Sequence, residues 1–244
     1  MVEIPNKPDP TLEAMKAAYL AEVSQKRVKR SYLGASLIGH DCSRHIWYSY
    51  KNYDGDEQMW GAKGHFSAES GHWAESVTAD RLRLIPGLQL WTHKEDGYQY
   101  GWKAMGGEFR GHVDGVIQGL LQAPKAFHIW EHKDKDHKYF TEFCNLKVSK
   151  GEKKTLEAWD KQYYVQAQIN MHYLEIDRHY LTVSLAGARA YESVRTEYNG
   201  EFAEQYVDRA AKIIESKSPP PRISEKPDFF KCKLCKFREV ECFK

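Results

Sequence analysis

The sequence predicts an α/β domain in which a mixed central sheet is flanked by helices. Three observations support this prediction: apolar residues recur at helical spacing in several segments, the middle of the chain alternates aromatic and β-branched residues at strand spacing, and a helical segment separates three predicted strands from two later ones. Helix, three antiparallel strands, helix and further strands is the order of a mixed-sheet α/β domain.

The first part of the chain contains helical segments separated by loops. We expect helices from about Pro10 to Lys29 and from His72 to Leu84, the second opened by Ser70-Gly71 and stopped by Pro86-Gly87. Between these helices the sequence predicts a loop through Gly34 and Gly39, a short amphipathic stretch from Cys42 to Tyr50, and a second loop from Asn52 to Gly64.

Strand patterns begin near residue 97 and recur after a helix. The expected strands are Gly97 to Met105, Phe109 to Gln118, Ala126 to Lys133, Tyr180 to Ala186 and Ala190 to Glu197. Turns are expected at Gly106-Gly107 and at Gln122-Ala123-Pro124. A basic loop from Lys147 to Lys154 should precede a helix from Leu156 to Glu175, and a last helix should run from Glu201 to Ser216 before three prolines end it.

Composition sets limits on the class of protein. The 244 residues fit one elaborated domain covering 1–244, and 41% hydrophobic residues are enough for a core. No segment approaches the roughly 18 apolar residues of a membrane helix, and no signal core follows the start, so a cytoplasmic protein is expected. The formal net charge of +2 argues against DNA binding by bulk electrostatics, but a nuclease also needs acidic residues to hold its cations.

The third predicted strand carries an acidic and a basic residue on one face. Side chains alternate along a strand, so Glu131 and Lys133 emerge on the same side, about 6–7 Å apart along the strand. This pair suits phosphodiester hydrolysis because a carboxylate can ligate Mg²⁺, while a lysine can orient or deprotonate water and stabilise developing charge.

Other charged residues fall where they can join this pair. Asp114 interrupts an apolar strand and is followed by Gly115, which allows close backbone approach. If these strands form a hairpin around Pro124, Asp114 and Glu131 can share a cation. His72 and Glu75 lie three residues apart on one helical face and can add ligands, and an imidazole would suit Mn²⁺ better than Mg²⁺.

Each motif alone has an ordinary structural explanation. The Glu131/Lys133 pair can be an exposed ion pair, Asp114-Gly115 a strand-end turn, His72 a helix-start residue and Glu75 a solvated residue. It is their order along the chain that favours a catalytic site.

The cysteines suggest a metal centre instead of disulfides. Five cysteines are an odd number, and Cys232-x-x-Cys235 is the spacing with which a short loop aims two thiolates at one metal. Together with Cys42 and Cys242 they would give four thiolates, which suit either Zn²⁺ or a [4Fe–4S] cluster. Cys144 is expected to be an ordinary half-buried thiol. His40 and His45 flank Cys42 and are the substitutes if Cys242 does not ligate.

The arrangement Asp114…Glu131-x-Lys133 resembles the signature of the PD-(D/E)XK nuclease superfamily. With Gly71-His72 upstream and the segment Tyr163-Tyr164-Val165-Gln166-Ala167-Gln168 downstream, the chain looks like the RecB-like branch. It is similar to phage-encoded exonucleases related to the iron–sulfur CRISPR adaptation exonucleases, which carry one cysteine in a segment like 39–48 and three at the end, as in 230–242. The likeness extends from about Ser31 onward.

The resemblance implies roles for individual residues and a restriction-endonuclease-like core. His72, Asp114, Glu131 and the carbonyl of His132 would be metal ligands, Lys133 the catalytic lysine, Gln166 or Gln168 the glutamine beside the scissile phosphate, and Glu75 a position of less defined role. It also implies a [4Fe–4S] cluster, with Zn²⁺ as the alternative, held by segments 31–50 and 222–244. Two features depart from the family: Asn170 stands where a tyrosine is usual, and six residues separate Cys235 from Cys242 where five are expected.

The sequence thus predicts a metal-dependent DNA nuclease using Mg²⁺ or Mn²⁺, an exonuclease acting on DNA ends or single strands in recombination or replication. The alternatives are a non-catalytic DNA-binding protein that retains the fold and the cluster, and a nuclease that acts on RNA or cuts internally. The expected partners are DNA and a recombination or single-strand annealing protein, without a membrane. The expected location is the cytoplasm, of a host cell if a phage encodes the chain.

Overall fold

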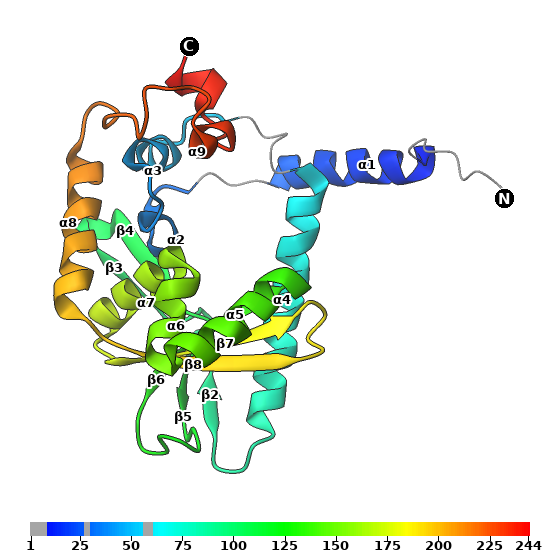
Figure 1. The fold of residues 1–244 in the computed structure, drawn as a ribbon, viewed down its shortest axis with the longest axis vertical. Coiled ribbons are helices and arrows are strands. Elements are labelled where there is room, and N and C mark those ends of the chain that lie inside the picture. Colours follow the sequence, from blue (N-terminus) through cyan, green and yellow to red (C-terminus); the bar gives the residue numbers. More distant parts are fainter. Residues whose placement is uncertain (1–8, 27–29, 56–60) are drawn as a thin grey trace.

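The computed structural model describes residues 9–26, 30–55 and 61–244. Its helices and strands follow one another in groups along the chain and form a mixed α/β architecture (Figure 1). The helices are α1 (Pro10–Lys26), α2 (Ala35–Ile38), α3 (Ser43–Tyr50), α4 (Gly61–Arg83), α5 (His137–Lys150), α6 (Glu152–Trp159), α7 (Lys161–Leu174), α8 (Gly200–Glu215) and α9 (Phe230–Lys233), with short turns η2 (Met105–Gly107) and η3 (Arg238–Cys242). The strands are β1 (Leu33–Gly34), β2 (Gln89–Trp91), β3 (Gly101–Ala104), β4 (Phe109–His112), β5 (Gly115–Gln118), β6 (His128–Lys135), β7 (Arg178–Leu185) and β8 (Tyr191–Glu197).

The strands form two sheets. The larger sheet has the order β2-β5-β6-β7-β8, in which β6 and β7 are parallel and the other pairs are antiparallel. The smaller sheet has the order β1-β4-β3. The hairpin expected around Pro124 is confirmed, since β5 and β6 pair with Gly115 opposite Trp130. The predicted mixed α/β fold class is therefore correct.

Helices cover both faces of the larger sheet. On one face, Ala79 of α4 packs with Trp130 of β6 and Ile117 of β5. On the other, Phe143 of α5 and Leu156 of α6 pack against β7 and β8. A further core joins α2, α3, α7 and α8 to the smaller sheet. Strand β6 is therefore enclosed from both sides, and a charged side chain on it is withdrawn from solvent unless it lies near the strand's end.

The strand predicted from Phe109 to Gln118 is wrong as one strand. It is divided into β4 and β5, which belong to different sheets, and the break falls at Val113 and Asp114. The β-branched and aromatic pattern continues through the break, so periodicity alone does not show it. The first predicted strand is shortened to β3, and the two short edge strands β1 and β2 were not expected.

Several helix boundaries also differ from prediction. Helix α4 begins at Gly61, inside the expected loop, and runs through Ser70-Gly71, which therefore does not open it. A helical glycine costs only about 1 kcal/mol, which packing of Ala74 and Thr78 in the interior can offset. The remainder of that expected loop, 56–60, and the end of the first expected helix, 27–29, lie outside the described residues.

The expected basic loop is wrong, because its residues end α5 and begin α6. Helix α5 has a recognisable start, since the Asp136 side chain accepts a hydrogen bond from Tyr139 N at 3.1 Å. The long helix expected after the loop is divided into α6 and α7 at Asp160, which caps α7 by accepting from Tyr163 N at 3.0 Å.

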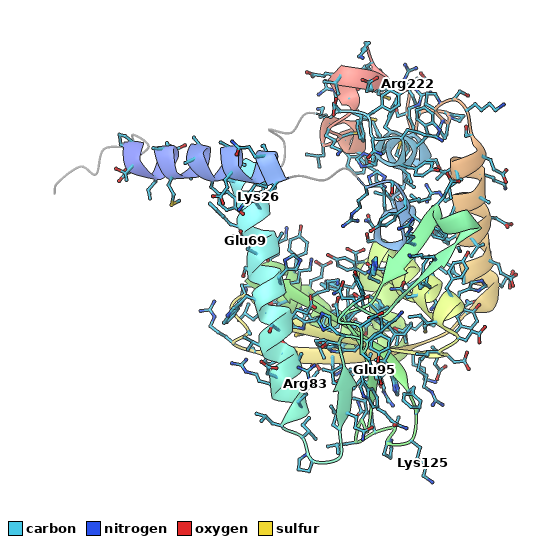
Figure 2. The ribbon with its side chains drawn as sticks, turned by 180° about the vertical axis from the view of Figure 1, so that it is seen from behind. Lys26, Glu69, Arg83, Glu95, Lys125 and Arg222 are labelled. Carbon is cyan, nitrogen blue, oxygen red and sulfur yellow. The ribbon has the colours of Figure 1, made fainter. Side chains whose placement is uncertain are left out.

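The first and last helices of the chain lie in different surroundings. Helix α9 and the C-terminal turn lie beside α3, whereas α1 extends across the end of α4, away from the sheets (Figure 1). Lys125 in the β5–β6 turn and Arg222 in the C-terminal segment mark opposite ends of the molecule (Figure 2). Among the described residues, no helix is both long and apolar enough to cross a membrane.

Candidate functional site

Strand β6 places Glu131 and Lys133 on the face that is covered by α7. The Lys133 ammonium donates to Glu131 Oε2 at 3.1 Å and to the carbonyl of His132 at 3.0 Å. Glu131 is only 4% exposed. The same-face pair expected from strand alternation is thus an ion pair between a buried glutamate and a partly buried lysine, and not a fully solvated pair.

Asp114 lies at the break between β4 and β5, beside β6. Its Oδ2 accepts a hydrogen bond from His132 N at 2.8 Å, so its carboxylate is held against the strand that carries Glu131. Gly115 allows close packing against the neighbouring strand β2, because a Cβ there would lie 2.8 Å from the carbonyl oxygen of Trp91. The interruption that the sequence prediction missed is what brings the aspartate to the site.

Glu75 enters from α4 and is affected electrostatically by the same residues. Burial, and then the charge of Asp114, raise the pKa of Glu75 to about 7. Burial, and then Asp114, likewise raise the pKa of Glu131 to about 8, although Lys133 opposes this shift. The pKa of Lys133 is raised as well, because the attraction of Glu131 and Asp114 outweighs its own burial. Three carboxylates beside one ammonium repel one another when ionised, so Glu75 and Glu131 keep their protons to higher pH, and a bound cation would favour their ionised forms.

Helix α7 contributes amides to Glu131. Gln166 Nε2 and Asn170 Nδ2 each lie 3.4 Å from Glu131 Oε1. Gln168 points elsewhere, since it donates to the carbonyl of Glu197 at 2.9 Å and accepts from Asn199 N at 2.8 Å. Of the two candidate glutamines, the structure brings Gln166 to the carboxylates and uses Gln168 to join α7 to the β8–α8 turn.

The histidines differ from the carboxylates in their placement. His72 is exposed on α4 and makes no hydrogen bond or ion pair to the described part of the chain. The His132 ring lies on the opposite face of β6, where it contacts Thr182 Oγ1 at 3.0 Å and Thr78 Oγ1 at 3.3 Å, and burial lowers its pKa to about 4. Its carbonyl faces Lys133, so only its backbone is available to the site.

Asn170, which departs from the family motif, contacts Glu131. The sequence alone did not predict this contact. Asn170 is fully buried and follows Gln166 by four residues, so both side chains lie on one face of α7. That spacing is the signal that would have found it.

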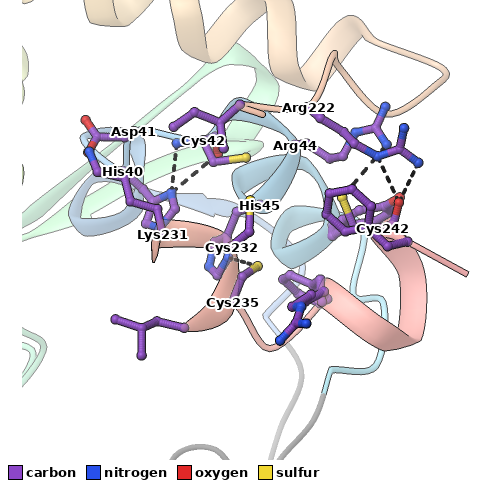
Figure 3. Close-up of a pocket in the computed structure, with 16 residues that line it drawn as sticks. His40, Asp41, Cys42, Arg44, His45, Arg222, Lys231, Cys232, Cys235 and Cys242 are labelled. Carbon is purple, nitrogen blue, oxygen red and sulfur yellow. Dashed lines mark hydrogen bonds and ion pairs between the residues drawn. The ribbon is translucent and has the colours of Figure 1, made fainter. Parts of the chain in front are cut away.

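A second candidate site lies where the two predicted cluster segments meet. Cys42, Cys232, Cys235 and Cys242 all line one cavity of about 270 Å³ (Figure 3). Burial raises the pKa of the Cys232 and Cys235 thiols, and the neighbouring Cys42 and Cys242 raise it further. Cys144 is on α5 and does not line this cavity.

Side chains around the cavity connect the sequence-distant segments. Arg44 Nε donates to the carbonyl of Pro220 at 2.6 Å, and Arg222 Nη2 donates to that of Cys242 at 2.6 Å. Lys231 forms an ion pair with Asp41.

Histidine also lies within reach of the sulfur atoms. His45 Nδ1 is 3.3 Å from Cys235 Sγ, and burial lowers the pKa of His45 to about 3, so the ring is neutral. His40 stacks on His45 with a ring separation of 4.1 Å.

Both sites contain side chains that could ligate a metal ion, but these side chains do not yet form a coordination shell. Across residues 9–26, 30–55 and 61–244, no three His, Cys, Asp or Glu side chains converge closely enough to hold a metal ion. The carboxylate oxygens suit Mg²⁺ or Mn²⁺, and the thiols suit Zn²⁺ or an iron–sulfur cluster. The chemical types of the donors therefore suit these metals. The donors are not close enough together to define a coordination shell.

No family model and no curated protein matches this chain. Among solved structures, the chain is similar to an alkaline exonuclease (LHK-Exo) from Laribacter hongkongensis, with 15% identity and a TM-score of 0.48 over 83% of this chain and 90% of that one. It is similar to a phage-related exonuclease from Haemophilus somnus, with 13% identity and a TM-score of 0.43 over 70% and 77%. A protein designated SSO0001 gives 14% identity and a TM-score of 0.49 over 96% of each chain. Similarities at this level do not assign a function to the chain.

Proposed function

We propose that this protein is a divalent-metal-dependent nuclease that hydrolyses DNA phosphodiester bonds at Asp114, Glu131 and Lys133, and that it acts as an exonuclease on DNA ends or single strands. The observation that carries the proposal is the ion pair between the buried Glu131 and the partly buried Lys133, 3.1 Å apart, beside an aspartate that is hydrogen-bonded to the intervening residue. A buried pair with an adjoining carboxylate is an expensive arrangement for a purely structural ion pair, because each charge must be desolvated.

The residues divide the chemistry between them. Asp114, Glu131 and the carbonyl of His132 would hold Mg²⁺ or Mn²⁺, with Glu75 as a further carboxylate at the margin. The cation supplies charge stabilisation to the phosphate oxygens and lowers the pKa of water. Lys133 is positively charged because its pKa is raised, so it suits donation to the attacking water or to a phosphate oxygen better than proton abstraction.

Two further residues complete the proposed site. Gln166, already 3.4 Å from Glu131, is placed to donate to the phosphate beside the scissile bond. His72 is proposed as an additional ligand, which would favour Mn²⁺ because an imidazole suits Mn²⁺ better than Mg²⁺.

We propose further that Cys42, Cys232, Cys235 and Cys242 bind one metal centre, a [4Fe–4S] cluster, with Zn²⁺ as the alternative. The support is that all four thiols line one cavity formed by segments from the two ends of the chain. Thiolate ligation would join these segments and contribute to folding stability. His45 is the substitute donor, since its Nδ1 already lies beside a cysteine sulfur.

The alternative function is a DNA-binding protein that does not cut. The full set of carboxylates and lysine favours the enzyme, because a non-catalytic protein would have no use for a buried, mutually repelling acidic group. A role in recombination or replication, alongside a single-strand annealing protein, would follow from activity on DNA ends.

The proposal is tested by digestion of end-labelled single- and double-stranded DNA with Mg²⁺ or Mn²⁺, using protein purified without oxygen. Wild-type protein should release nucleotides from the ends and stop when EDTA is added. Glu131→Ala should be inactive, and Glu192→Ala should remain active as the matched control, since Glu192 forms a comparable ion pair with Lys147 at 2.6 Å. DNA binding without cleavage under every metal condition would favour the non-catalytic alternative.

A further inference from the structure

We propose that Asn170, held in place by Trp102, is a positioning residue that sets the orientation of the Glu131 carboxylate for cation binding. The inference rests on the proposed function, because it assigns a task at the same site. It concerns a side chain that contacts neither the cation nor DNA and acts through Glu131.

Trp102 determines how the Asn170 amide is turned. Its indole Nε1 donates to Asn170 Oδ1 at 2.9 Å, and both side chains are buried. An indole nitrogen is only a donor, so the asparagine oxygen must face Trp102 and its NH₂ group must face the other way. The indole is itself fixed, since it stacks on Tyr173 with ring centroids 4.1 Å apart.

The NH₂ group of Asn170 then meets two acceptors. Nδ2 lies 3.4 Å from Glu131 Oε1 and 3.4 Å from the carbonyl oxygen of His112. Each of its hydrogens therefore has a partner. The other oxygen of Glu131, Oε2, is bonded to Lys133 at 3.1 Å. With Asn170 and Gln166 on Oε1 and Lys133 on Oε2, the plane of the carboxylate is defined before any cation arrives.

A glycine leaves room for this arrangement. A Cβ at Gly111 would lie 2.5 Å from the Trp102 ring and 2.6 Å from Asn170 Oδ1, both closer than real Cβ contacts. Gly111 lies opposite Trp102 in the β3–β4 pair. The smaller sheet thus places Trp102 and Gly111 together so that Asn170 can lie between them.

The contacts link the two sheets through one side chain. Trp102 belongs to β3 in the smaller sheet, Glu131 to β6 in the larger sheet, and Asn170 to the helix between them. Outer partners that orient a metal ligand commonly contribute 10–100-fold to metal affinity or activity. Without Asn170, Oε1 of Glu131 would keep only its 3.4 Å contact with the more exposed Gln166 side chain, and the carboxylate would be less firmly oriented.

The test measures Mn²⁺ binding without DNA, by calorimetry or manganese EPR, and then kcat and KM for DNA hydrolysis. Asn170→Leu keeps the branched shape of the side chain, although leucine is larger, and removes every side-chain hydrogen bond, so the Mn²⁺ dissociation constant should rise about tenfold or more and kcat should fall, with KM for DNA little changed. Trp102→Phe removes the indole donor together with part of the ring, leaves Asn170 in place, and should give a smaller rise, about threefold. Gly111→Ala should act in the same direction by forcing the pair apart.

Trp47→Phe is the matched control. Trp47 is also buried and its indole donates one hydrogen bond, to the carbonyl of Ser216 at 3.0 Å, but it is remote from Glu131. Its Mn²⁺ affinity should equal that of the wild type. Equal weakening by Trp47→Phe and Trp102→Phe would show a general loss of stability and would overturn the inference, as would unchanged Mn²⁺ affinity in a folded Asn170→Leu or Trp102→Phe protein. A wild type that neither binds Mn²⁺ nor cuts DNA would instead overturn the proposed function, and the inference with it.

Discussion

The carboxylate site and the cysteine cavity gather potential metal ligands in opposite ways. Glu131 and Lys133 come from one strand, and Asp114 is bonded directly to the residue between them. The cysteine cavity joins Cys42 to residues beyond position 230, and its neighbouring segments are connected through arginine and lysine side chains at its rim. The carboxylate site is built on the larger sheet, whereas the cysteine cavity brings together two segments, 40–48 and 222–243, that are far apart in the sequence.

This difference indicates that the two proposed metals would have different roles. At the carboxylate site the backbone of the larger sheet fixes the donors, so a cation would add chemistry to a fold that already exists. At the cysteine cavity a metal would add covalent links between segments that are distant in sequence and would stabilise the junction itself. Loss of ligands should therefore abolish activity at the first site with little effect on stability, and should lower stability at the second.

The largest expected effect is the loss of activity in Asp114→Ala and Lys133→Ala. Each should lower the rate of DNA hydrolysis by about 10²–10³-fold or more, because each removes charge that is needed at the transition state. Thermal unfolding should change little in either variant. Lys147→Ala, which breaks the comparable Lys147–Glu192 pair, should keep full activity. Retention of activity in Lys133→Ala would remove the distinction between the two ion pairs.

The second prediction concerns the cysteine cavity. Cys42→Ser should lower the free energy of unfolding about as much as Cys232→Ser, although the two are far apart in sequence, because an incomplete thiolate shell loses the metal. Protein purified without oxygen should be brown and absorb near the roughly 400 nm region of thiolate-bound iron–sulfur centres.

Cys144→Ser is the control and should leave colour and stability unchanged, since Cys144 lies on α5. A colourless protein with one zinc would keep the four-thiolate site and remove the iron–sulfur assignment. Protein without either metal, in which Cys42→Ser has no effect, would contradict a metal centre in this cavity.

The features that the sequence predicts in these regions depend on residues close together in the sequence, and those that it does not predict depend on residues far apart in it. The Glu131–Lys133 spacing is a local property of a strand, and strand alternation was sufficient to place both side chains on one face. The division at Asp114 was not predictable in this way, because it depends on which sheet each half joins. Asn170 was similarly hidden, since its partners Trp102 and Glu131 are distant in sequence and the link exists only after the two sheets are packed.

The third prediction is a pH dependence of stability in the metal-free protein. Folded Glu131 and Glu75 have pKa values raised to about 8 and about 7, so the folded state binds more protons than the unfolded state above pH of about 4.5. Their contribution to stability is present at low pH and is lost as pH rises toward 8.

Buried histidines with lowered pKa values, such as His132, contribute the opposite slope below about pH 6.5. The informative window is therefore pH 6.5 to about 8, with stability measured by denaturant titration. Wild-type protein should lose stability there relative to Glu131→Gln, and Mn²⁺ should restore it. Parallel curves for the two proteins would show that Glu131 ionises normally.

The smallest expected effect belongs to His72. Because His72 is exposed and makes no contact with the carboxylates among the described residues, His72→Ala should leave the fold intact and weaken Mn²⁺-supported activity more than Mg²⁺-supported activity. DNA binding should change less than the metal requirement. His137→Ala, at another exposed histidine, is the control, and an equal response to both substitutions would exclude His72 as a ligand.

The most direct test of the central claim is the location of the cation, measured by anomalous diffraction at the manganese edge from crystals soaked in Mn²⁺. We expect a manganese peak within coordination distance of the Asp114 and Glu131 carboxylates and the His132 carbonyl, and we expect this peak to be lost in Glu131→Ala. A manganese peak that avoids these residues and persists in Glu131→Ala would contradict a catalytic cation site on β6.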